Sequence, residues 1–145
     1  MSTRTDLDPK QAARRLVSQH DDTTWLSTFA AELDRRLHTE QLARVMSLWQ
    51  LSRSDLGRVF GVTRQALTKW LHDGVPADRV AEVADLAAVN DLLVRYLKRD
   101  RISAVVRRPS DNLDGRSLLD LVAEGRTTEA LNAARRMFAF TDAHA

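Results

Sequence analysis

The side chains best suited to recognise another molecule are concentrated between residues 53 and 72. Arginine, glutamine and threonine can form hydrogen bonds with the edges of bases, while lysine and arginine bind phosphate. In this stretch they recur at helical spacing on the side of a segment whose other side is apolar. The pattern predicts a helix that reads double-stranded DNA. The candidate DNA-binding residues are Arg53, Thr63, Arg64, Gln65, Thr68, Lys69 and His72.

The same stretch has the residues that a helix-turn-helix requires. Asp55 lies three residues after Ser52, which predicts a capping box at the start of the first helix. Gly57 is small enough to let the two helices cross closely, and Gly61 suits a tight turn. A hydroxyl at Thr63 can then cap the second helix. An ordinary helical hairpin with solvated charges is the alternative, but it does not require these residues at matching spacing.

The position of each candidate residue predicts its role. We expect Arg64, Gln65 and Thr68 to contact bases, because the first turn of a recognition helix enters the major groove. We expect Lys69 and Arg53 to contact phosphates. Arg53 begins the first helix, whose N-terminus itself attracts anions.

The whole chain predicts an all-α fold, in which a long helix joins a helix-turn-helix bundle to a small C-terminal helical domain. Strand patterns are nearly absent, and apolar residues recur at spacings of three and four. A loop is expected at 107–112, where the helical pattern breaks. The expected helices span residues 9–20, 23–38, 39–49, 52–60, 63–73, 76–98, 117–124 and 128–140.

We expect three domains along the chain: an N-terminal helical extension (1–38), a helix-turn-helix domain with its connecting helix (39–98) and a C-terminal domain (99–145). The extension has an apolar face from Trp25 to Leu33, which we expect to pack on the helix-turn-helix or on a second subunit.

Composition argues against an enzyme. The 145 residues contain no cysteine, which excludes disulfides, thiolate catalysis and cysteine-ligated zinc. The four histidines are spread over separate elements, so neither a metal site nor a cofactor is expected. The net charge is only +2, so any case for nucleic acid depends on how the charges are distributed.

The chain has no apolar stretch close to the roughly 20 residues that a membrane-spanning helix needs. Its first ten residues are polar and lack the apolar core of a signal peptide. We therefore expect a cytoplasmic protein that does not contact the membrane.

Two segments resemble a known family. Residues 52–70, followed by Gly74 and Pro76, resemble an Xre/Cro-type helix-turn-helix. Residues 108–126 resemble the toxin-binding domain of the Xre/MbcA/ParS antitoxins, with Pro109 followed by a Leu-x-Gly-Arg-Ser turn and a Leu-Asp-Leu helix. The resemblance covers about residues 42–140. This chain has Leu118 where the family usually has proline, and Val105 where it often has tryptophan.

The resemblance implies an antitoxin. Such a protein pairs with a RES-domain toxin that destroys NAD, blocks the toxin's active site through its C-terminal domain, and represses its own operon. A homodimer or a toxin–antitoxin hetero-oligomer is expected. Taken alone, Arg116 could equally solvate a helix end and Phe140 could be a core residue. The candidate partner-binding residues are Arg108, Asp114, Arg116 and Phe140.

Two alternatives remain open at this stage. The chain could be a stand-alone regulator of phage or plasmid type, whose C-terminal domain serves only for dimerisation. It could also be a nucleoid-associated structural protein that binds DNA with little sequence preference.

Overall fold

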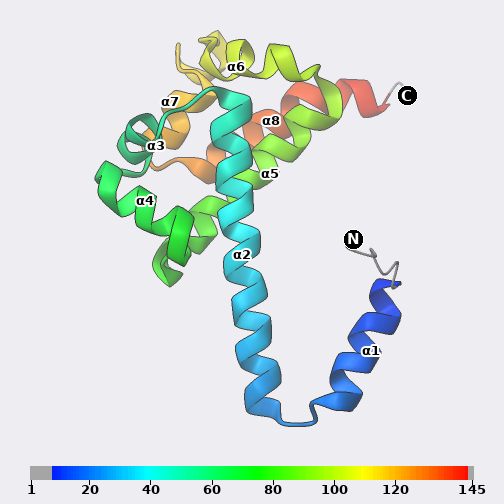
Figure 1. Ribbon diagram of the computed structural model, residues 1–145. Coiled ribbons are helices and arrows are strands. Elements are labelled where there is room, and N and C mark those ends of the chain that lie inside the picture. Colours follow the sequence, from blue (N-terminus) through cyan, green and yellow to red (C-terminus); the bar gives the residue numbers. More distant parts are fainter. Residues whose placement is uncertain (1–7, 144–145) are drawn as a thin grey trace. The chain divides into compact units, whose positions relative to one another are not determined.

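The computed structural model describes residues 8–143, and their side chains as far as Ala139. The described residues are helical apart from the connections, and they contain no strand (Figure 1). An isolated bridge between Ser110 and Arg116 is their only β-type pairing. The predicted all-α fold is confirmed. The chain divides into two compact units, residues 1–34 and 35–145.

The first unit contains α1 (Pro9–Gln19) and the beginning of α2 (Thr23–Trp49). Pro9 occupies the first turn of α1, where its missing N–H has no partner to lose. The His20 ring stacks on Trp25 with centroids 3.8 Å apart. None of residues 8–34 is buried, so the described part of this unit has no core of its own.

α2 continues without a break through residues 38 and 39, where the sequence analysis expected one helix to end and another to begin. That prediction was wrong. It depended on the Thr39 hydroxyl acting as a cap, but this hydroxyl donates instead to the Trp70 carbonyl oxygen, 3.3 Å away. Neither glycine nor proline stands between residues 23 and 49 to stop the helix.

The second unit contains the rest of α2 and a bundle of shorter helices. The predicted helices agree with those observed to within a few residues, except that the sequence analysis assigned no helix to residues 99–107. These elements are α3 (Arg53–Phe60), α4 (Arg64–Asp73), η1 (Ala77–Arg79), α5 (Val80–Tyr96), α6 (Arg99–Arg107), η2 (Asp111–Leu113), α7 (Leu118–Ala123) and α8 (Thr127–Ala143).

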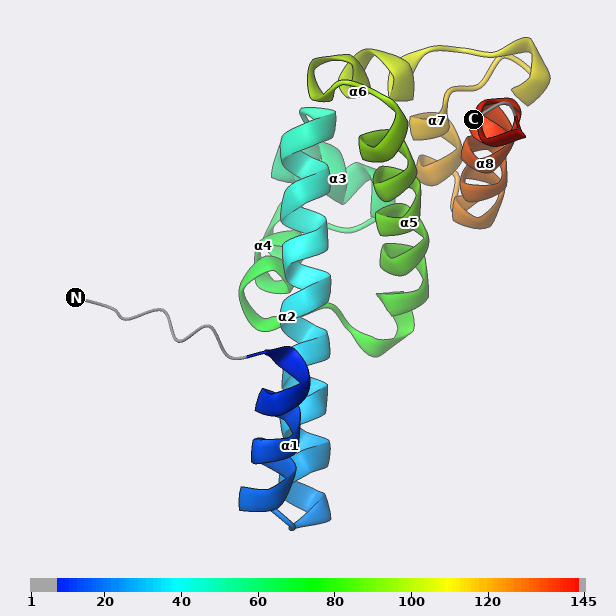
Figure 2. The ribbon, with the colours of Figure 1, turned by 90° about the vertical axis from the view of Figure 1, so that its right-hand side faces the viewer.

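α5 forms the centre of this unit, between the C-terminal part of α2 and α8 (Figure 2). On one side, the Trp49 indole donates to the Asn90 side-chain oxygen at 3.0 Å, and both residues are buried. On the other side, Tyr96 stacks on Phe138 with centroids 4.6 Å apart. Because α5 packs against both neighbours, the expected domains 39–98 and 99–145 share one core.

The guanidinium of Arg107 closes the C-terminal end of α2. It donates to the carbonyl oxygens of Trp49 at 2.7 Å and Gln50 at 3.2 Å. Gln50 is in the left-handed region at φ 54°, and the Leu51 N–H returns to the Met46 carbonyl at 2.9 Å. The last carbonyls of α2 therefore gain partners that the helix itself cannot supply.

Candidate nucleic-acid interface

α3 begins with the capping box that the sequence predicted. The Asp55 N–H donates to the Ser52 hydroxyl, and the Ser52 N–H donates to the Asp55 carboxylate, both at 3.0 Å. These bonds, together with the Arg58 guanidinium, hold the pKa of Asp55 below its ordinary value. The box fixes the first turn of α3, which carries Arg53.

The turn between α3 and α4 is closed by two backbone hydrogen bonds. Gly61 is in the left-handed region at φ 67°. Its N–H donates to the Arg58 carbonyl oxygen, and the Val62 N–H donates to the Gly57 carbonyl oxygen at 2.8 Å. A Cβ on Gly57 would lie 2.8 Å from the Val62 carbonyl oxygen, closer than real side chains approach. Gly57 was expected to let the two helices cross closely; in the structure it permits the close approach of the turn to α3.

The inner side of α4 is fixed in the core. Thr63 caps the helix by accepting from the Ala66 N–H at 3.0 Å. Leu67 and Trp70 are buried, and the Trp70 ring meets Phe60 edge to face at 5.5 Å. α4 is therefore held at its start and along its inner face.

The outer side of α4 exposes the candidate residues. Arg64, Gln65, Lys69 and His72 are all exposed. The side chains of the first three have no hydrogen-bond or ion-pair partner among the residues that the structure describes. The His72 imidazole lies 3.9 Å from the Asp73 carboxylate. The helix presents several long polar side chains together, on one side, without internal partners.

Thr68 and Arg53, unlike the other candidates, are hydrogen-bonded to each other. The half-buried Thr68 hydroxyl donates its hydrogen to the Arg64 carbonyl at 3.0 Å and accepts from the Arg53 guanidinium at 3.4 Å. Arg53 therefore reaches across from α3 to α4. The structure thus brings all seven predicted DNA-binding residues to the α3 N-terminus and α4.

Three of the predicted partner-binding residues, Arg108, Asp114 and Arg116, lie elsewhere in the second unit, around a tight turn that follows α6. The Ser110 N–H donates to the Arg116 carbonyl at 3.1 Å, and Asp114 is left-handed at φ 56°. Either Asp114 or Ser117 could have capped the next helix. The structure selects Ser117, which forms a capping box with Asp120.

Arg116 belongs to a chain of ion pairs. Its guanidinium donates to the Glu124 carboxylate at 2.8 Å, Glu124 also pairs with Arg126 at 3.1 Å, and Arg126 pairs with Glu129. The two arginines lower the pKa of Glu124. Of the other partner-binding candidates, Arg108 and Asp114 are exposed, and the Phe140 side chain lies outside the described residues.

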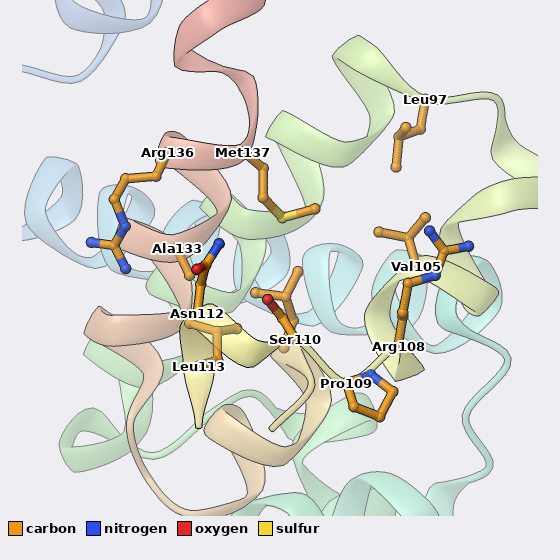
Figure 3. A pocket seen from close by; sticks show the side chains of 11 residues that line it. Leu97, Val105, Arg108, Pro109, Ser110, Asn112, Leu113, Ala133, Arg136 and Met137 are labelled. Carbon is orange, nitrogen blue, oxygen red and sulfur yellow. The ribbon is translucent and has the colours of Figure 1, made fainter. Parts of the chain in front are cut away.

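A cavity of about 590 Å³ opens beside this turn (Figure 3). Met137 of α8 and Val105 of α6 lie on opposite sides of it, and Arg108 and Arg136 supply the positive charge of its lining. Only Arg108 among these was predicted. The cavity is lined by residues between 97 and 118 together with residues of α8, so the periodicity of a single helix carries no signal for it.

No group of three potential metal ligands occurs among residues 8–143. In the same range, no helix is both long enough and apolar enough to cross a membrane.

The geometry defines an all-α protein with a capped helix-turn-helix whose second helix exposes a polar, basic face. Comparison with known proteins adds one relative. The chain is 30% identical over 94 residues to the uncharacterized protein y4oB of Sinorhizobium fredii, a match that covers 62% of this chain and 73% of the relative. The chain belongs to the same family as that protein. No family model matches the chain, and no solved structure matches it significantly.

Proposed function

We propose that this protein is a cytoplasmic transcriptional repressor that binds an operator through α4. The observation that supports the proposal is the division of α4 into a buried side and an outer side where Arg64, Gln65 and Lys69 are exposed and unpaired. A helix built in this way can enter a major groove without first breaking internal ion pairs.

The side chains on the outer face of α4 suit different parts of a DNA duplex. Arg64 and Gln65 occupy the first turn, where arginine suits guanine and glutamine suits adenine. Lys69 lies one turn further on, where an ammonium group can neutralise a phosphate. The N-terminus of α4 adds the positive end of its helix dipole.

The experiment compares binding to the DNA upstream of the protein's own gene with binding to scrambled DNA of equal length. Arg64→Ala and Gln65→Ala should each remove about 1–3 kcal/mol of discrimination between the two probes. Arg135→Ala, an exposed arginine on α8, is the matched control and should leave both affinities unchanged. Equal affinity of the wild-type protein for both probes would instead favour a nucleoid-associated protein.

We propose as a second activity that the C-terminal part neutralises a RES-type, NAD-degrading toxin. Three features support this: the resemblance of residues 108–126 to a toxin-binding domain, the bridged turn that those residues form, and the cavity beside it. Arg108 is exposed and lines that cavity, so it is available to an acidic partner.

Co-expression with a RES-domain toxin encoded beside the gene tests this activity. Cellular NAD should be preserved by the wild-type protein and depleted with Arg108→Glu, while the control Arg14→Glu on α1 should protect fully. NAD that stays high when the toxin is expressed alone would count against an antitoxin role. It would favour a stand-alone regulator whose C-terminal part serves only for dimerisation.

A further inference from the structure

Exposed apolar side chains are concentrated near the start of the chain. Five large apolar residues are exposed in the described part of the molecule, and four of them lie between residues 17 and 37. Leu33 and Leu37 on α2 are 52% and 50% exposed. Exposed apolar surface gathered in this way marks an interaction site.

α2 carries two apolar stripes on different sides of the helix. Leu42, Val45 and Trp49 form the C-terminal stripe, which is buried in the core. The N-terminal stripe consists of Leu26, Ala30, Leu33 and Leu37, and none of its members is buried. At roughly 100° per residue, the five-residue step from Leu37 to Leu42 rotates the stripe by about 140°. Leu37 therefore does not lie on the face of α2 that packs in the core.

α1 does not supply the missing cover. None of its residues is buried, and Val17, on its own apolar side, is 56% exposed. Ala12 and Leu16 of α1 and Leu26 of α2 are half-buried, but Leu33 and Leu37 are left 52% and 50% exposed.

We propose that the N-terminal stripe of α2 is a dimer interface, in which the α2 helices of two copies pair antiparallel. The 4-3-4 spacing of the stripe is that of alternating a and d positions in a heptad. With a two-fold axis between residues 31 and 32, Leu26 meets the partner's Leu37. Ala30 then meets the partner's Leu33, so that a small residue lies opposite a large one at the centre of the stripe.

The flanking residues also suit a second copy in this register. Ser27 on one flank lies opposite the partner's Asp34, so the carboxylate faces a hydroxyl and not another carboxylate. On the other flank, Phe29 lies opposite the partner's Arg36, so no like charges face each other there either. A parallel pair would instead place Ala30 against the partner's Ala30 and leave a gap. The surface thus complements itself, as a two-fold interface must.

The first experiment measures the mass of the full chain in solution without DNA, so its outcome does not depend on the proposed repressor function. The wild-type protein should have twice the 16.4 kDa of one chain. Leu33→Glu should raise the dimer dissociation constant at least 100-fold while far-UV circular dichroism stays unchanged, because Leu33 is exposed in the single chain. Ala31→Glu, which places the same charge on the opposite side of α2, should leave the dimer intact.

Two results of that measurement would overturn the proposal: a wild-type protein that remains monomeric at 100 times the concentration used for DNA binding, or a Leu33→Glu variant that dimerises like the wild type. The first result would indicate that another protein covers the stripe.

The second experiment tests the register and uses the absence of cysteine from the chain. Mixed Ser27→Cys and Asp34→Cys proteins should form a disulfide-linked dimer on oxidation, whereas each alone should form little. A mixture of Asp34→Cys with Ser47→Cys, which lies far along the same helix, should not cross-link. Cross-linking of Ser27→Cys alone as efficiently as in the mixture would contradict the antiparallel arrangement.

Discussion

The Arg53 guanidinium, at the start of α3, donates to the Thr68 hydroxyl on α4 at 3.4 Å. The two residues are fifteen positions apart and belong to the two helices of the helix-turn-helix. The hydroxyl cannot also donate to a base, because its hydrogen is used on the Arg64 carbonyl. In the proposed complex, Thr68 therefore acts mainly by holding Arg53 in place for a phosphate.

This relationship predicts non-additive effects on DNA binding. Arg53→Ala should lower affinity for operator and scrambled DNA alike, and should reduce the slope of log K against log salt by about 1. Thr68→Val keeps the shape of the side chain but removes the acceptor, and should weaken binding about threefold, the effect of an exposed hydrogen bond. The double variant should bind no more weakly than Arg53→Ala alone. Fully additive losses would show that Thr68 contacts DNA independently.

Local sequence patterns predicted the helix-turn-helix well because its signals are short-range. The Ser52 capping box, the Gly61 turn and the Thr63 cap each depend on residues within three or four positions. The predicted break near Thr39 failed for the opposite reason: the Thr39 hydroxyl finds its partner at Trp70, thirty-one residues away.

Long-range packing also explains what the sequence analysis missed. α6 carries three arginines among its nine residues, but Ile102 and Val106, four residues apart, are fully buried. The role of Arg107 depends on the end of α2, more than fifty residues earlier, and Arg116 depends on Glu124. Charged residues that appear solvated in the sequence are thus structural, and only tertiary contacts reveal this.

Adding a single methyl group at Gly57 should clearly lower the free energy of unfolding. Gly57→Ala should destabilise the fold by about 1–3 kcal/mol, because the new Cβ would press against the Val62 carbonyl oxygen and push the turn away from α3. Urea denaturation followed by circular dichroism measures the change. Ser54→Ala, an exposed position in the same helix, should change stability by less than about 0.5 kcal/mol. A Gly57→Ala protein as stable as the wild type would contradict the role given to this glycine.

Replacing Arg107 should lower the stability of the fold but leave the outer face of α4 intact. Arg107→Ala should cost about 1–2 kcal/mol, because the carbonyls of Trp49 and Gln50 lose a charged donor. Arg101→Ala removes an exposed arginine from the same helix and should be nearly neutral. Thermal unfolding of the two variants gives the comparison. Equal melting temperatures would show that water replaces the guanidinium at no cost.

The ion-pair chain at Glu124 predicts how stability depends on pH. Arg116 and then Arg126 lower the pKa of Glu124 in the folded protein below its ordinary value of 4.5. A carboxylate with a lowered folded pKa contributes stability above its unfolded pKa and loses that contribution as the pH falls through the folded value. Stability that depends on Glu124 should therefore be constant near neutral pH and decline below about pH 4.5.

Urea midpoints of Glu124→Gln and the wild type between pH 7 and pH 3 test this directly. The variant should be less stable at pH 7, because glutamine cannot pair with both arginines, and the difference should shrink as the pH falls. Glu40→Gln, an exposed carboxylate on α2, should follow the wild-type curve throughout. A difference between Glu124→Gln and the wild type that persists unchanged at pH 3 would mean that side-chain shape, and not charge, makes Glu124 stabilising.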